Sequence, residues 1–125
     1  FKGGVEHSDL NLTKLRDTFE ENVAASRKPS QKVYIKEKDS SLALAELMAE
    51  GHLFDFIYVD GSHVASEVLT DACLCFNMLK SGGVILFDDY DGGAGVKHAV
   101  QSFYNVNYKD VEVLCTNYQI AFQKR

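Results

Sequence analysis

The sequence predicts an α/β fold in which helices cover a mainly parallel sheet that ends in an antiparallel hairpin. Residues 54–59 and 84–87 are short, nearly continuous apolar runs, as expected for strands that are buried on both faces. A helical pattern lies between them, and a strand, helix, strand unit makes a right-handed crossover that leaves its two strands parallel. Two further strand-like runs, residues 111–115 and 118–122, are close enough in the chain to form the hairpin.

Three elements are predicted ahead of the first buried strand. Apolar side chains recur every three or four positions over residues 10–25, which is typical of an amphipathic helix. Residues 32–36 have the alternation of a short strand. Asp39 and Ser40 can cap the next helix, which we expect to stop at Gly51 because glycine readily adopts the left-handed conformation found after helix ends.

Glycines also mark the connections in the second half of the chain. The helix between the two buried strands is predicted to run to about Leu79, and residues 80–83 then form the return turn. A further helix is predicted over residues 95–104. The glycine-rich segment 91–97 lacks the spacing of a Walker phosphate loop, so it is either a substrate loop or a flexible connection.

Length and composition limit the classes of function. The chain has 125 residues, of which 46% are hydrophobic, so we expect one domain over residues 1–125. A net charge of −5 argues against nucleic acid as the main partner, because such binding depends on clustered lysine and arginine. No apolar run approaches the roughly 20 residues that cross a bilayer, and no signal sequence is recognisable. We expect a soluble, cytoplasmic protein without a membrane partner.

The cysteines are odd in number and show no zinc-ligand or disulfide spacing. Cys73, Cys75 and Cys115 all have apolar neighbours in the sequence. We therefore expect reduced, buried thiols.

Acidic side chains follow both buried strands directly. Asp60 follows the run 54–59, and Asp88 and Asp89 follow the run 84–87; we call these three residues the acidic trio. The carboxyl ends of neighbouring parallel strands meet at one edge of the sheet, where open α/β sheets bind ligands. Clustered carboxylates repel one another, and hard oxygen ligands suit Mg²⁺, Mn²⁺ or Ca²⁺. The pattern favours a divalent-cation site, and the alternative that Asp60 and Asp88 only cap the following turns stays open.

A histidine accompanies the acidic trio. His63 lies three residues after Asp60, at the predicted start of the third helix and over the same edge of the sheet. Imidazole can accept a proton near neutral pH, especially from a hydroxyl that a metal has made more acidic. By position alone, a general base and an exposed histidine at a helix start are equal alternatives. The tyrosines are scattered, and we interpret most of them as packing residues, with only Tyr90 adjoining the acids.

Two stretches of the sequence carry a resemblance to a known family. Residues 54–63 read Phe-Asp-Phe-Ile-Tyr-Val-Asp-Gly-Ser-His, and residues 79–90 read Leu-Lys-Ser-Gly-Gly-Val-Ile-Leu-Phe-Asp-Asp-Tyr. This pattern resembles the class I S-adenosylmethionine-dependent methyltransferases, which have a Rossmann-like sheet. Within them it is most similar to metal-dependent O-methyltransferases of the catechol and natural-product sugar types, where an acid ends the fourth strand and an acidic pair ends the fifth.

The resemblance implies a cofactor, a metal and an acceptor. The cofactor is S-adenosylmethionine, the metal is a divalent cation such as Mg²⁺, and the acceptor is a small molecule with a hydroxyl group. The acidic trio matches the metal ligands of the family, and His63 falls where the family places its lysine or histidine base. A weaker match implies that Asp39 and Ser40 contact the adenine ring of the cofactor.

The sequence differs from the family at its N-terminal end. In the family, the first strand ends in an acidic, glycine-rich turn that holds the methionine part of the cofactor, and the second strand supplies an acid for the ribose. Neither is present, so we expect roughly the C-terminal two-thirds of the family domain, with a central strand missing from the sheet. The strands would then re-pair directly, a second copy would donate a strand in a homo-oligomer, or the natural protein has more sequence. A non-catalytic relative that serves as a binding or assembly module stays open as the alternative.

Overall fold

The computed structural model describes residues 12–125, and the chain divides into two compact units, residues 1–38 and residues 39–125. In the first unit, α1 (Leu12–Ser26) confirms the amphipathic helix predicted over residues 10–25, of which residues 10 and 11 lie outside the described residues. The prediction of one domain over residues 1–125 stays a prediction.

The strand predicted over residues 32–36 is wrong. These residues belong to no helix or strand, and the side chains of the apolar positions are open to solvent, with Tyr34 83% exposed. A strand needs a neighbour for its backbone N–H and C=O groups, because a single extended segment leaves them to water. Alternation of side chains predicts the local conformation but supplies no such neighbour.

The second unit is an α/β fold around a mixed four-stranded sheet. Its strands are β1 (Phe54–Val59), β2 (Leu79–Phe87), β3 (Val111–Thr116) and β4 (Ile120–Lys124). They are ordered β1-β2-β4-β3, with β1 parallel to β2 and with β4 antiparallel to both of its neighbours. This arrangement confirms the parallel crossover and the C-terminal hairpin. In chain order the elements are α2 (Ser40–Ala49), β1, α3 (Ala65–Met78), β2, α4 (Ala94–Asn107), β3 and β4.

The return turn predicted at residues 80–83 is absorbed into β2 as an irregularity. Phe54 pairs with Leu79 and Phe56 already pairs with Val84, so β2 has extra residues between two positions that are close together on β1. Gly82 has a φ of 77°, a left-handed conformation that glycine adopts without a steric penalty. The chain therefore passes from α3 into β2 without a separate loop.

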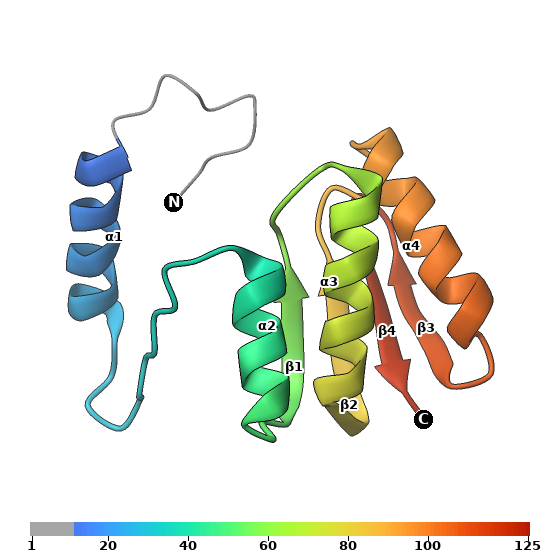
Figure 1. Ribbon diagram of the computed structural model, residues 1–125, viewed down its shortest axis with the longest axis horizontal. Coiled ribbons are helices and arrows are strands. Elements are labelled where there is room, and N and C mark those ends of the chain that lie inside the picture. Colours follow the sequence, from blue (N-terminus) through green and yellow to red (C-terminus); the bar gives the residue numbers. More distant parts are fainter. Residues whose placement is uncertain (1–11) are drawn as a thin grey trace. The chain divides into compact units, whose positions relative to one another are not determined.

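The helices α2, α3 and α4 cover one face of this sheet (Figure 1). At the centre of the covered face, the Phe103 ring of α4 lies 5.8 Å from the Phe87 ring and 5.9 Å from the Phe122 ring, measured between ring centroids. All three side chains are at most 1% exposed. This aromatic cluster fixes the ends of β2 and β4 near the site described below. Within residues 12–125, no helix is both long and apolar enough to cross a membrane.

The cysteines are free, but only one of them is buried. Cys75 lies in the core on the inner side of α3, whereas Cys73 on the same helix and Cys115 on β3 are exposed. The expectation of three buried thiols is therefore wrong for Cys73 and Cys115. Apolar neighbours in the sequence did not predict which side of α3 or β3 each cysteine occupies.

Candidate functional site

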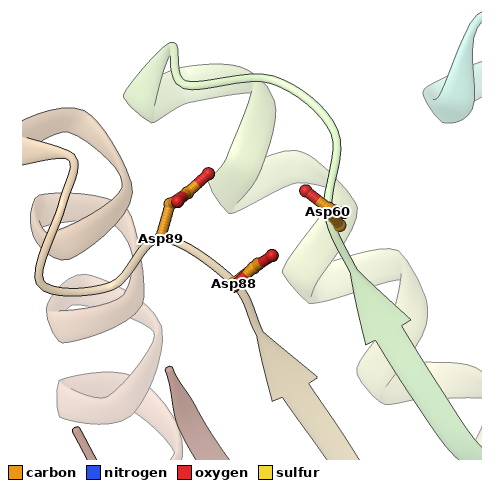
Figure 2. Close-up of side chains that lie close together, drawn as sticks. All are labelled: Asp60, Asp88 and Asp89. Atoms are coloured by element: carbon orange, nitrogen blue, oxygen red, sulfur yellow. The ribbon is translucent and has the colours of Figure 1, made fainter. Parts of the chain in front are cut away.

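The acidic trio gathers at the carboxyl ends of β1 and β2 (Figure 2). One carboxylate oxygen from each of Asp60, Asp88 and Asp89 can be chosen so that all three lie within 4.8 Å of one another. The last residues of the two strands, Val59 and Phe87, are paired in register, and the Asp88 backbone N–H donates to the Val59 carbonyl at 3.0 Å. Because the last residues of these two parallel strands are paired, the acids that follow them lie side by side. The sequence predicted this juxtaposition.

The left-handed backbone conformation of Asp89 lets the side chains of Asp88 and Asp89 point to the same side. Successive side chains of a strand point to opposite faces, so Asp88 and Asp89 would diverge if β2 continued. Asp89 instead has a φ of 51°, a conformation that aspartate tolerates better than most residues. Its carbonyl accepts hydrogen bonds from the N–H groups of Gly92 and Gly93 at 3.2 and 2.9 Å, which closes a tight turn.

Two side chains from other elements hold the carboxylate of Asp88. The Tyr58 hydroxyl donates to Oδ2 at 2.5 Å, and the Gln119 amide donates to Oδ1 at 2.8 Å. These hydrogen bonds, that of Tyr58 first, lower the pKa of Asp88, and the bond to Asp88 raises the pKa of Tyr58 to about 12. The backbone N–H of Asp89 also lowers the pKa of Asp88, by less than the two side chains do, so Asp88 has a partner in the following turn as well.

The carboxylate of Asp89 is held in the same way. His63 Nε2 lies 2.9 Å from Oδ2, and the Tyr118 hydroxyl donates to Oδ1. Because a carboxylate oxygen only accepts, we assign the hydrogen to Nε2, and in the neutral ring Nδ1 is then the nitrogen that can accept a proton. The His63 side chain is 49% exposed and lies in the turn before α3, so a small molecule can reach it.

Close backbone packing fixes the turn that carries His63. A Cβ atom on Gly95, the second residue of α4, would lie 2.2 Å from the carbonyl oxygen of His63. No real Cβ approaches another atom so closely, so only glycine allows α4 to start against this turn. The first turn of α4 therefore packs against the backbone of His63.

A small hollow joins these groups. It is lined by polar groups of the loop after β1 and of the acidic trio, and by apolar side chains from the strands and from α3 and α4. The apolar lining residues are Val59, Val68, Phe87 and Val96. The carboxylates thus share this hollow with apolar side chains, while Asp60 stays exposed and Asp88 and Asp89 are partly exposed.

The methyltransferase domain family matches residues 4–90, which include β1, β2 and the acidic trio. The chain belongs to this family. A search of curated proteins gave no match. Membership thus rests on a family match that spans more than half of the chain, including the segment that builds the site.

Two solved methyltransferases have a similar fold. One is MycE from the mycinamycin biosynthetic pathway, in complex with Mg, SAH and mycinamycin VI, with a TM-score of 0.61, 14% identity, and coverage of 81% of this chain and 33% of that chain. The other is apo CalS11, a TDP-rhamnose 3'-O-methyltransferase of calicheamicin biosynthesis, with a TM-score of 0.59, 13% identity, and coverage of 90% and 50%. At these identities the likeness shows the fold. The methyltransferase domain described here spans between a third and a half of the compared chains.

Asp39 and Ser40 lie at a separate hollow of this methyltransferase domain. Asp39 is the N-cap of α2, and its Oδ1 accepts hydrogen bonds from the N–H and the hydroxyl of Ser41 at 3.1 and 2.6 Å. Ser40 is hydrogen-bonded to Asp71, whose pKa is raised mainly by burial. The hollow beside these residues shares no lining residue with that of the acidic trio. Asp39 is confirmed as the predicted cap, Ser40 is instead the first residue of α2, and contact of either residue with adenine stays a prediction.

The sequence did not predict three residues that contact the acidic trio. Tyr58, Tyr118 and Gln119 bind the acids, whereas the tyrosines were interpreted as packing residues with only Tyr90 near the trio. A signal existed for Tyr58, because it precedes Asp60 by two positions and strand alternation places such residues on the same side. No local signal marked Tyr118 or Gln119, because they reach the acids only through the hairpin.

Proposed function

We propose that this domain serves an S-adenosylmethionine-dependent, divalent-metal-assisted O-methyltransferase acting on a small-molecule hydroxyl, and that it carries the metal- and acceptor-binding part of the site. The observation that carries the proposal is the acidic trio at the ends of β1 and β2 of a methyltransferase domain. The compared structures support it, because CalS11 is an O-methyltransferase and the MycE complex contains Mg.

The trio fits a small divalent cation. Mg²⁺ binds oxygen at about 2.0–2.1 Å in octahedral geometry, so neighbouring oxygen ligands of such an ion would be about 3 Å apart. The chosen carboxylate oxygens lie within 4.8 Å of one another, so the carboxylates would draw together by up to about 2 Å around such an ion. Two unit charges about 4 Å apart repel by about 1 kcal/mol in water and by about 4 kcal/mol near a protein surface, and a cation between them reverses the sign. Mg²⁺ is the metal we expect, since it usually keeps positions for water and substrate oxygens.

In this mechanism the protein acts mostly by positioning. Asp60, Asp88 and Asp89 would hold the cation, which when bound lowers the pKa of an acceptor hydroxyl. His63 accepts the proton of that hydroxyl at Nδ1, while its Nε2–H continues to donate a hydrogen bond to Asp89. Asp39 and Ser40 remain the proposed contacts for the adenine of the methyl donor.

Substitution of the base tests the proposal. In an assay of methyl transfer from labelled S-adenosylmethionine to a panel of hydroxyl-bearing small molecules, His63→Ala should lower turnover by about 10²–10⁴-fold. Turnover is compared at saturating Mn²⁺, because His63 also holds Asp89 and its loss should weaken the proposed metal site. His98→Ala, at an exposed histidine of α4, is the matched control. Equal turnover in the two variants would remove His63 from the mechanism.

A second candidate function is a non-catalytic binding or assembly module. Such a module would need only the acidic trio as its metal site, which the described residues contain. Calorimetric titration with S-adenosylmethionine, with and without Mg²⁺, separates the two candidates. Saturable binding of S-adenosylmethionine by the full-length protein supports the enzyme, and binding of Mg²⁺ without binding of S-adenosylmethionine by that protein supports the module.

A further inference from the structure

We propose that the turn of the β3–β4 hairpin is a positioning element for the acidic trio, in which Gln119 orients Asp88 and Tyr118 orients Asp89. This inference rests on the proposed function, because it gives the two side chains a role toward the metal ligands. Neither residue touches the reacting atoms in this proposal; each acts through the carboxylate that it holds.

Sheet topology brings the turn to the acids. Because β4 lies between β2 and β3, the first residue of β4 pairs with the last residue of β2, as Ile120 does with Phe87. The residues just before β4 and just after β2 therefore lie beside each other. A hydrogen bond of 2.8 Å from the Asn117 N–H to the Gln119 carbonyl closes the turn at this point.

Gln119 and Tyr58 hold Asp88 from two sides. The Gln119 amide donates to Oδ1 at 2.8 Å, and the Tyr58 hydroxyl donates to Oδ2 at 2.5 Å. The same amide nitrogen lies 3.4 Å from the Tyr58 hydroxyl oxygen, which links the two donors. A carboxylate held at both oxygens cannot rotate freely about its terminal bond, so its plane is fixed.

Tyr118 and His63 hold Asp89 in the same two-point manner, with the tyrosine hydroxyl on Oδ1 and the imidazole on Oδ2. The position of Tyr118 is itself fixed by contacts that do not involve the acid. Its carbonyl accepts a hydrogen bond from the Asp91 N–H at 3.1 Å, and its ring lies so close to Gly92 that an added Cβ would be 3.0 Å from the ring edge.

These donors leave room for a cation. Each carboxylate oxygen has two lone pairs, so an oxygen that accepts one hydrogen bond can still bind a metal. Partners that orient metal ligands in this way are worth about 10–100-fold in metal affinity. The hairpin turn would thus set the geometry of two of the three proposed ligands.

The test is Mn²⁺ affinity, measured by calorimetry and by electron paramagnetic resonance on the whole chain. Tyr118→Phe removes only the hydroxyl and keeps the ring on Gly92, and Gln119→Ala removes the amide. Each should weaken Mn²⁺ binding by about 10–100-fold with an unchanged Tm. Tyr108→Phe and Gln101→Ala, at exposed positions away from the site, are matched controls and should stay within about twofold of the wild type.

The outcomes separate this inference from the proposed function. If the wild type binds Mn²⁺ and both hairpin variants bind it as tightly as their controls, the positioning role is overturned while the metal site stands. If the wild type shows no saturable Mn²⁺ binding, the metal part of the proposed function fails and the inference fails with it. If the hairpin variants bind Mn²⁺ more weakly than the wild type and the control variants do not, the positioning role is supported.

Discussion

Replacing Gly95 with alanine should destabilise the α/β unit by about 1–2 kcal/mol. The new Cβ would lie 2.2 Å from the His63 carbonyl oxygen, more than 1 Å short of an ordinary contact, which begins at 3.4 Å. Overpacking of this kind costs about 1–3 kcal/mol. The gain from replacing a helical glycine by alanine is at most about 1 kcal/mol, so the clash outweighs it.

Thermal unfolding followed by circular dichroism measures the effect. At about 4–8 °C per kcal/mol for a unit of this size, the Tm of Gly95→Ala should fall by at least about 4 °C. Gly61→Ala is the matched control, because a Cβ on Gly61 would meet nothing within 4 Å. If the two variants melt within about 1 °C of each other, the close packing of α4 at Gly95 against the His63 carbonyl does not contribute to stability as we predict.

Three further predictions concern Cys75 and Lys124. Burial raises the pKa of Cys75 from 9.0 to about 12, so at pH 8 iodoacetamide should alkylate Cys73 and Cys115 but spare Cys75, as read by mass spectrometry. Because the folded-state pKa is the higher one, the stability that Cys75 contributes is fully present below pH 9 and is lost as the pH rises toward 12. Lys124→Met should cost about 1–3 kcal/mol in denaturant unfolding, because the Lys124 ammonium donates at 2.9 Å to two carbonyls at the end of α3. Lys109→Met, at an exposed position, should cost less than about 0.5 kcal/mol.

The sequence predicts those parts of the site whose positions follow from residues nearby in the chain. The apolar runs of β1 and β2 predict parallel strands, and an acid directly after each run must then lie at the shared edge. The prediction that both faces of these strands are buried is wrong for β1, where Phe56 and Tyr58 are 57% and 47% exposed, because the described helices cover one face of the sheet (Figure 1). His63 follows from the same reasoning, because three residues after Asp60 the chain is still at that edge. Its hydrogen bond to Asp89 confirms that proximity.

The remaining part depends on contacts between distant segments. The strand expected over residues 32–36 lacks a partner within the described structure, and no local pattern reveals whether a partner exists. Gln119 meets Asp88 because β4, and not β3, lies next to β2, an order that the hairpin pattern alone does not specify. Likewise, the left-handed backbone conformation of Asp89 turns its carboxylate toward that of Asp88. Two consecutive aspartates in the sequence do not predict this conformation.

Mn²⁺ affinity of Asp88→Asn tests most directly the claim that the acidic trio is the metal-binding part of a methyltransferase site. The account predicts saturable binding by the wild type and binding at least about 10-fold weaker in this variant, because a charged ligand is replaced by a neutral one. Asp55→Asn is the control, since Asp55 is an exposed acid of β1 that pairs with Lys80 at 2.9 Å and belongs to no such cluster among the described residues. Absence of saturable binding by the wild type, or equal affinity in the two variants, would contradict the account.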